Sequence, residues 1–142
     1  TLKKRERPRL LVIGGKGSDG EILNSMERYD PSTNAWEEEA VAPMPTARKF
    51  VGTAELHGKL YAAGGMNEED GATSNPVERY DLATKSWEEV ASMASARQAH
   101  SMTMLDGNLY AVGGYIGGGL SSVERYDPAT NAWEAVAPMA EA

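Results

Sequence analysis

The side chains best suited to chemistry occur at three equivalent places in this 142-residue chain. A Glu-Arg pair begins at Glu27, at Glu78 and at Glu124, and each pair is followed by Tyr-Asp. A carboxylate beside a basic group can take part in proton transfer. Because the pair repeats at one place in three similar segments, a shared structural role is the better interpretation. We expect these groups to form hydrogen bonds that brace the contacts between segments.

Other candidates for catalysis or metal binding are few. The chain has two histidines, His57 and His100, and no cysteine. A zinc site needs three or four converging ligands, which two isolated histidines do not supply. The acidic runs at 37–39 and 68–70 are more simply explained as solvated charge. The sequence therefore predicts no catalytic residue, no metal site and no cofactor, and we expect that the protein is not an enzyme.

Two arginines offer a different chemistry. Arg48 and Arg97 each stand four residues after a methionine, Met44 and Met93 respectively. The guanidinium group forms two parallel hydrogen bonds with a carboxylate, which suits the binding of an acidic peptide. The alternative is that both arginines brace neighbouring loops, and the residues by themselves leave both interpretations open.

The segments that must position these side chains recur with a period of about 50 residues. In each of them a tryptophan follows the tyrosine of Glu-Arg-Tyr-Asp by seven residues. A period of this size indicates a repeat architecture, in which neighbouring units bury one another's faces. Each repeat also contains a glycine pair, at 14–15, 64–65 and 113–114.

The sequence pattern of a complete repeat predicts four short antiparallel strands, and no segment has helical periodicity. In the third repeat the expected strands are 98–105, 109–112, 123–126 and 133–136, with a tight hairpin turn at 106–107. Such a sheet is one blade, and blades stacked around an axis form a β-propeller. Because the first repeat begins at its second strand, the all-β fold should contain about eleven strands. We expect the tryptophan of every repeat to pack between neighbouring sheets.

The repeats resemble kelch repeats over nearly the whole chain. The features that carry the resemblance are Gly-Gly, Glu-Arg-Tyr-Asp, Trp and Pro-Met at these spacings. The version with Val-Glu-Arg-Tyr-Asp-Pro resembles kelch-like adaptors, in which BTB and BACK domains precede a six-bladed propeller. The resemblance implies half of such a ring at residues 10–142, with blades at roughly 10–45, 46–94 and 95–142, and a basic linker at 1–9.

The same resemblance implies a partner-binding rim around the central channel. Arg48 and Arg97 match arginines that lie at this rim in kelch-like adaptors and contact acidic peptides. Residues that follow the glycine pairs or open the third strand face the same rim, with Pro76 in place of the serine in the second repeat. These residues are Lys16, Met66, Tyr115, Ser25 and Ser122.

Composition limits the kinds of partner. The net charge is −7, and residues 1–9 hold five Lys or Arg against one Glu, so that +4 there leaves −11 for the rest. An acidic body argues against nucleic acid, because phosphate binding needs clustered cations. No apolar run approaches the roughly 18 residues that cross a membrane. The absence of cysteine fits a reducing compartment, and we expect a cytoplasmic protein.

Together these features predict a protein-interaction module. The resemblance implies substrate recognition for a cullin-RING ubiquitin ligase adaptor, with a protein or an acidic peptide as partner. A structural or cytoskeletal, actin-binding scaffold is the alternative, and a fragment of a kelch-type enzyme is less favoured. The chain is expected either to form a homodimer that completes six blades or to be a fragment of a longer protein.

Overall fold

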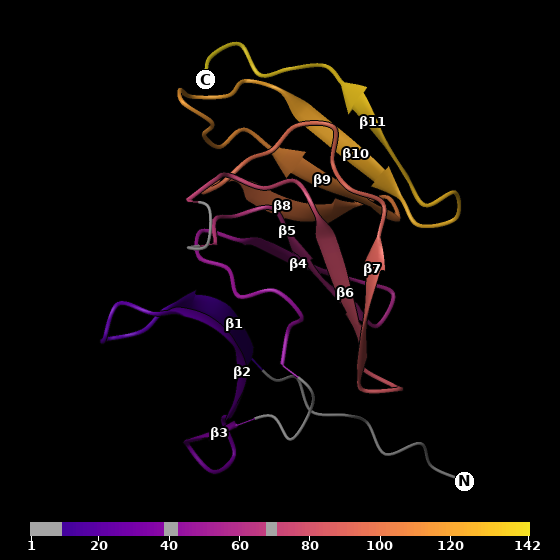
Figure 1. Cartoon of the computed structure of the whole chain (residues 1–142). Helices are drawn as coiled ribbons and strands as arrows, with labels where there is room; N and C mark the ends of the chain where they lie inside the picture. Colours follow the sequence, from indigo (N-terminus) through magenta and orange to yellow (C-terminus); the bar gives the residue numbers. More distant parts are fainter. Residues whose placement is uncertain (1–9, 39–42, 68–70) are drawn as a thin grey trace, which may run out of the picture.

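The computed structural model describes residues 10–38, 43–67 and 71–142, which form three antiparallel sheets (Figure 1). Blade 1 contains three strands, β1 (Leu10–Lys16), β2 (Ile22–Asp30) and β3 (Ala35–Glu38). Blade 2 contains β4 (Gly52–Leu56), β5 (Lys59–Ala63), β6 (Val77–Asp81) and β7 (Ser86–Val90). Blade 3 contains β8 (Ser101–Leu105), β9 (Asn108–Val112), β10 (Val123–Asp127) and β11 (Ala132–Val136).

This arrangement confirms the predicted all-β fold of kelch-type blades with eleven strands in the described ranges. Strands that follow one another in the sequence lie side by side in each sheet, and each sheet falls within one of the three ranges expected for the blades. The predicted basic linker at 1–9 and the acidic run at 68–70 lie outside the described residues.

Local turn chemistry explains why the strands begin and end where they do. Asp106 and Gly107 have φ values of 50° and 78°, and Leu105 pairs with Asn108 across this two-residue turn. Positive φ at both central residues matches the right-handed twist of the flanking strands. After the third strand of blade 3, the carboxylate of Asp127 accepts a hydrogen bond from the backbone N–H of Ala129, 2.9 Å away. This Asx turn ends β10 and directs the chain into β11.

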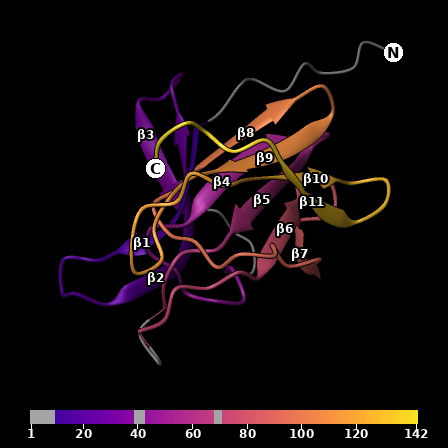
Figure 2. The same cartoon turned by 90° about the horizontal axis from the view of Figure 1, so that it is seen from above.

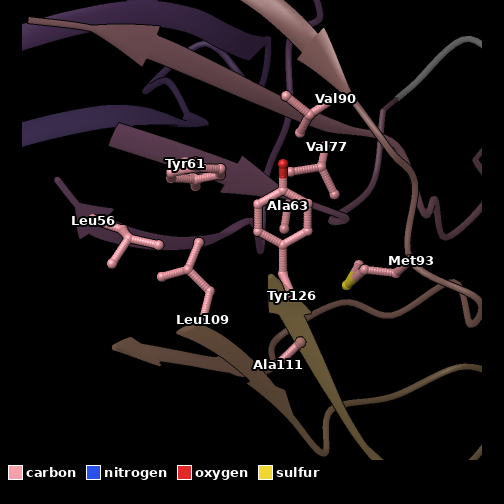
Figure 3. Packing of buried hydrophobic residues seen from close by; sticks show 9 residues of the cluster. All are labelled: Leu56, Tyr61, Ala63, Val77, Val90, Met93, Leu109, Ala111 and Tyr126. Carbon is pink, nitrogen blue, oxygen red and sulfur yellow. The ribbon is translucent and has the colours of Figure 1, made fainter. Parts of the chain in front are cut away.

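The largest core cluster lies between blades 2 and 3 (Figure 3). One face of the blade 2 sheet packs against blade 3. Blade 3 contributes Leu109, Ala111 and Tyr126 to this contact, and all three are fully buried. The rings of Tyr61 and Tyr126 are 5.6 Å apart and tilted by 59°, so the two faces interdigitate. The residues from blade 2 are Leu56, Tyr61, Ala63, Val77, Val90 and Met93.

The same contact recurs between blades 1 and 2, where Ile13, Met26 and Met44 pack against Ala62 and Tyr80. Blade 2 therefore has a neighbour on each side (Figure 1). In the view from above, the strands of blade 3 partly overlap those of blade 2 (Figure 2).

The expectation that all three tryptophans pack between sheets was wrong for one of them. Trp87 and Trp133 are partly buried against the clusters, whereas Trp36 is 52% exposed. Spacing along the sequence places all three rings on equivalent strands, but burial of each ring depends on the neighbouring blade. Among the described residues no strand packs on the Trp36 side of β3.

The cluster between blades 2 and 3 should dominate the stability of the molecule. Leu109→Ala should lower the free energy of unfolding by about 2–5 kcal/mol, because it removes a fully buried side chain and leaves a cavity. Urea denaturation followed by tryptophan fluorescence measures this loss. Leu82→Ala, at a position 37% exposed, is the matched control and should cost below about 1 kcal/mol. Equal losses in the two variants would contradict the assignment of the core.

Candidate functional site

Two short linkers carry the arginines singled out by the sequence. Linker 1 (residues 44–51) leads from blade 1 to blade 2, and linker 2 (residues 93–100) leads from blade 2 to blade 3. Each linker begins at a buried methionine whose backbone N–H donates to the blade just completed. Met44 donates to the carbonyl of Asn24 at 2.9 Å, and Met93 donates to the carbonyl of Asn75 at 3.0 Å.

The glycine pairs hold the backbone of these linkers by hydrogen bonds and by close contact. The N–H of Gly15 donates to the carbonyl oxygen of Arg48 at 2.7 Å, and Gly65 donates to that of Arg97 at 2.9 Å. The preceding glycine of each pair lies so close that an added Cβ would approach the same carbonyl oxygen to 2.6 Å at Gly14 and 2.4 Å at Gly64. Any larger side chain would displace the linker, which accounts for the repeated glycine.

The side chain of Arg97 points in the opposite direction, into blade 3. Its Nη1 donates to the carbonyls of Gly113 and Ser122 at 2.9 and 3.0 Å. Its Nη2 donates to the hydroxyl of Ser122 at 3.2 Å and to the carboxylate of Glu124 at 2.8 Å. Glu124 also accepts the backbone N–H groups of Ala94 and Ser95, at the start of the same linker. The backbone of linker 2 is thus held by blade 2 and its arginine by blade 3.

Arg48 makes the equivalent contacts in blade 2. Its Nη1 donates to the carbonyls of Gly64 and Pro76 at 3.0 and 2.7 Å, and its Nη2 lies 3.4 Å from the carboxylate of Glu78. Thr46 donates to the same carboxylate at 2.8 Å. Burial lowers the pKa of Arg48, and the nearby charge of Glu78 opposes that shift.

Arg48 and Arg97 therefore occupy the bracing position that the sequence left as the alternative to peptide binding. Their side chains are 1% and 0% exposed, so neither guanidinium group is presented to solvent. Glu78 and Glu124 supply the bracing carboxylates that their repetition suggested, whereas Glu27 in blade 1 is exposed. A role of the two arginines in binding a partner stays a prediction.

The remaining predicted site residues divide by exposure. Lys16 and Tyr115 are exposed, Met66 is half-buried, and Ser25 and Ser122 are half-buried, with Ser122 engaged by Arg97. Met66 forms a backbone bridge to linker 1 at Lys49, and Tyr115 forms the equivalent bridge to linker 2 at Gln98. The described parts of the loops that follow the glycine pairs all lie toward the left in Figure 1.

Sequence reasoning missed Phe50 in linker 1. Phe50 is 56% exposed and has a φ of 54°, a left-handed conformation that bulky residues rarely adopt. The ammonium of Lys49 lies 5.9 Å from the centre of the ring. The backbone carbonyl of Phe50 accepts a hydrogen bond from the N–H of Ala99 at 2.9 Å. Ala99 is one residue from Gln98, which forms the bridge to Tyr115. The available signal was that the only phenylalanine of the chain stands two residues after Arg48.

His100 lies at the end of linker 2, buried between blades 2 and 3. An added Cβ at Gly52 would approach the Nε2 of His100 to 2.3 Å, so this glycine leaves the space that the ring fills. Neither ring nitrogen has a hydrogen-bond partner among the described residues. Burial, helped by the positive charge of Arg97 and opposed by Glu124, lowers the pKa of His100 to about 4. The ring is therefore neutral at pH 7.

The described residues contain no group of three His, Asp or Glu side chains placed to hold a metal ion. A helix of sufficient length and hydrophobicity to cross a membrane is also absent from these residues.

The ion pair between Arg97 and Glu124 should be a requirement for stable packing of blade 3. Arg97→Ala should cost about 3–5 kcal/mol of unfolding free energy, because it leaves the carboxylate of Glu124, 4% exposed, without its cation. Arg125→Ala is the control, since this guanidinium pairs with Glu134 near solvent, and it should leave the urea midpoint nearly unchanged. A loss for Arg97→Ala as small as that of the control would show that Arg97 is not a brace.

His100 should make stability depend on pH. The pKa of the folded state, about 4, lies below the ordinary value of 6.5, so the unfolded chain binds more protons between these values. The contribution is complete above pH 6.5 and is lost as the pH falls toward 4. The difference in unfolding free energy between wild type and His100→Gln should shrink by about 2–3 kcal/mol over this range. A difference independent of pH would mean that His100 is not buried in its neutral form.

The sequence of this chain is similar to kelch-repeat proteins. A model described as the KLHDC2/KLHL20/DRC7 Kelch-repeats domain matches residues 3–142. Kelch-like protein 40 of Xenopus tropicalis is 32% identical over 104 residues, which is 73% of this chain and 16% of that protein. Kelch-like protein 23 of Homo sapiens is 32% identical over 92 residues, or 65% of this chain and 15% of that protein.

A third relative has a different printed name. The influenza virus NS1A-binding protein homolog of Xenopus laevis is 46% identical over 77 residues, which is 54% of this chain and 12% of that protein. The chain thus spans about one sixth or less of the length of these curated relatives. The three blades, their glycine-seated linkers and a family match over residues 3–142 together show that this chain belongs to the kelch-repeat family.

Proposed function

We propose that this chain is a protein-interaction module, and that the longer protein to which it corresponds recruits substrates to a cullin-RING ubiquitin ligase. The similarity to kelch-like proteins supports the proposal. The observation that carries it is the exposure of large apolar side chains beside the linkers. These are Phe50 at 56%, Tyr115 at 48% and Ile116 at 46% exposed.

We propose that these residues form one binding surface together with two cations. Lys49 lies over the ring of Phe50, and Lys16 is exposed at the end of β1. Aromatic side chains supply contact area at low entropic cost, and they are common among residues that dominate binding energy. The lysines favour a negatively charged ligand on a chain that is otherwise acidic, so we propose an acidic peptide as the partner.

Within this proposed surface Tyr115, Met66 and Lys16 contact the partner through their side chains. Ser25 provides a hydroxyl group at the edge of the same surface. Arg48, Arg97 and Ser122 support it from below through the hydrogen bonds of the linkers.

We propose no enzymatic role and a cytoplasmic location, since the lack of cysteine fits a reducing compartment. A pair of chains that completes six blades stays a prediction of the sequence. An actin-binding scaffold is the competing function, and co-sedimentation of the chain with filamentous actin would favour it over peptide recognition.

The binding surface can be tested with a library of acidic peptides displayed on phage. A selected peptide should lose about tenfold in affinity on Tyr115→Ala and a similar amount on Lys16→Glu, because each removes a contact group from the exposed rim. Isothermal titration calorimetry measures both. Lys85→Glu changes the charge of an exposed turn between β6 and β7 and serves as the control. Equal affinity in all variants would place the binding surface elsewhere.

The adaptor role needs a separate experiment. A reporter that carries the selected peptide should become ubiquitinated in a reconstituted cullin-RING reaction when BTB and BACK domains are fused before residue 1. Tyr115→Ala should slow that transfer at limiting reporter concentration while the fusion still binds the cullin. Peptide binding without ubiquitination of the reporter would retain the interaction module and reject the adaptor role.

A further inference from the structure

The turn that joins β8 to β9 has a chemically reactive sequence. Its two central residues are Asp106 and Gly107, and the same dipeptide occurs in blade 1 as Asp19 and Gly20. Another copy begins at Asp70, outside the described residues. The backbone nitrogen of a glycine can attack the side-chain carboxyl carbon of the aspartate before it, because the glycine has no Cβ to shield its nitrogen. The local structure decides whether this attack can occur.

The side chain of Asp106 is available for the reaction. Asp106 is exposed, and no hydrogen bond or ion pair engages its carboxylate within the described part of the chain. Aspartates at the ends of other strands are held in place. The carboxylates of Asp81 and Asp127 each accept the backbone N–H two residues further on, at 2.8 and 2.9 Å. Asp127 is also followed by Pro128, whose nitrogen carries no proton.

The backbone nitrogen of Gly107 is available as well. Leu105 pairs with Asn108 across the turn, and the N–H of Gly107 has no backbone acceptor among the described residues. In blade 1 the N–H of Gly20 instead donates to a carbonyl of its own loop at 3.0 Å. That hydrogen bond must break before the nitrogen can turn toward the aspartate side chain. The two dipeptides therefore differ in the group that attacks, although their sequences are the same.

The turn between β8 and β9 can reach the reactive conformation while its strands stay paired. The φ values of Asp106 and Gly107, 50° and 78°, are those of a type I′ turn. Rotation of the peptide plane between the two residues gives a type II′ turn, in which ψ of the first residue is about −120°. At that ψ the nitrogen of Gly107 eclipses the Cβ of Asp106, so the carboxyl carbon can close on it. Both turn types suit two-residue hairpins, and glycine accepts either sign of φ.

The fold does not need a carboxylate at this position. His57 and Gly58 form the equivalent turn between β4 and β5, with φ values of 50° and 74°. Leu56 pairs with Lys59 across that turn, as the flanking residues do in blade 3. The turn of blade 2 thus has the same backbone shape without the reactive group, and it supplies a matched replacement for Asp106.

We propose that Asp106 and Gly107 form a site of spontaneous backbone modification. The nitrogen of Gly107 attacks the protonated carboxyl group of Asp106. A carbon–nitrogen bond forms, and the hydroxyl of the carboxyl group leaves with the amide proton as water. The product is a succinimide, which holds the turn in the type II′ form. Water then adds to either carbonyl carbon of the ring and breaks its bond to the nitrogen, which yields aspartate or isoaspartate.

Isoaspartate alters the hairpin that contains it. The main chain then runs through the former side chain, so the turn is longer by a carbon atom and carries a free α-carboxylate. The present register of β8 and β9 places Met104 opposite Leu109, which is fully buried. A longer turn shifts the two strands against each other, so isoaspartate should weaken the packing of blade 3. The free α-carboxylate is a substrate for an isoaspartyl methyltransferase that uses S-adenosylmethionine.

Ageing of the full chain at physiological temperature and neutral pH tests the proposal. Isoaspartate is measured in tryptic peptides by methyltransferase-catalysed labelling from S-adenosylmethionine. Peptide 98–125, which contains Asp106, should gain label several-fold faster than peptide 17–28, which contains Asp19. In concentrated urea the two peptides should gain label at similar rates, because unfolding removes both the turn and the hydrogen bond of Gly20.

Two substitutions assign the label to the proposed site. Asp106→His copies the turn of blade 2, so label should be lost from peptide 98–125 while the melting temperature of the fresh protein stays near that of wild type. Asp106→Asn should accelerate labelling, because ammonia is the better leaving group from an amide at neutral pH. The proposal is overturned by equal labelling of the two peptides in the folded chain. Label that persists in Asp106→His, or no acceleration in Asp106→Asn, would overturn it as well.

Discussion

The structure depends on a linker whose backbone belongs to one blade and whose arginine belongs to the next. The carbonyl of Arg97 is held by Gly65 of blade 2, while its guanidinium group is enclosed by blade 3. Arg48 joins blades 1 and 2 in the same way. Apolar packing supplies most of the driving force between blades, but it is not directional. The directional hydrogen bonds of the arginine set the distance between neighbouring sheets and their relative position along the stack.

Burying this arginine–glutamate pair costs hydration free energy, and its stability depends on every hydrogen-bonding group around it. A buried guanidinium and a buried carboxylate lose hydration, and the loss is offset only when their remaining donors and acceptors are bonded. Around Arg97 the backbone supplies those partners, through two carbonyls for the arginine and two N–H groups for Glu124. The glycine pairs belong to the same unit, because an added Cβ would push the linker carbonyl away. The repeated Gly-Gly, Arg and Glu are therefore one structural feature spread over about 60 residues.

The sequence predicted what depends on local spacing. Alternation, turn residues and the repeat period were enough for the strands, their order and the all-β fold, because each hairpin forms from neighbouring residues. It did not decide between binding and bracing for Arg48 and Arg97, since that depends on which blade the side chain faces. Trp36 and Trp133 have the same local sequence and different exposure, because burial comes from a neighbouring sheet. Phe50 was missed because its left-handed backbone follows from the linker contacts.

Within residues 10–38, 43–67 and 71–142, only the middle blade packs against another blade on both faces, and this sets an order in which backbone amides become accessible to solvent water. Stability in such stacks is close to a sum of terms within units and between neighbours, so opening begins at the outer units. In the described part of the chain blade 1 has three strands and one neighbouring blade, and its amides should exchange with deuterium first. Exchange in β5 and β6 requires the loss of both neighbouring contacts, so these strands form the slowest-exchanging centre of the molecule.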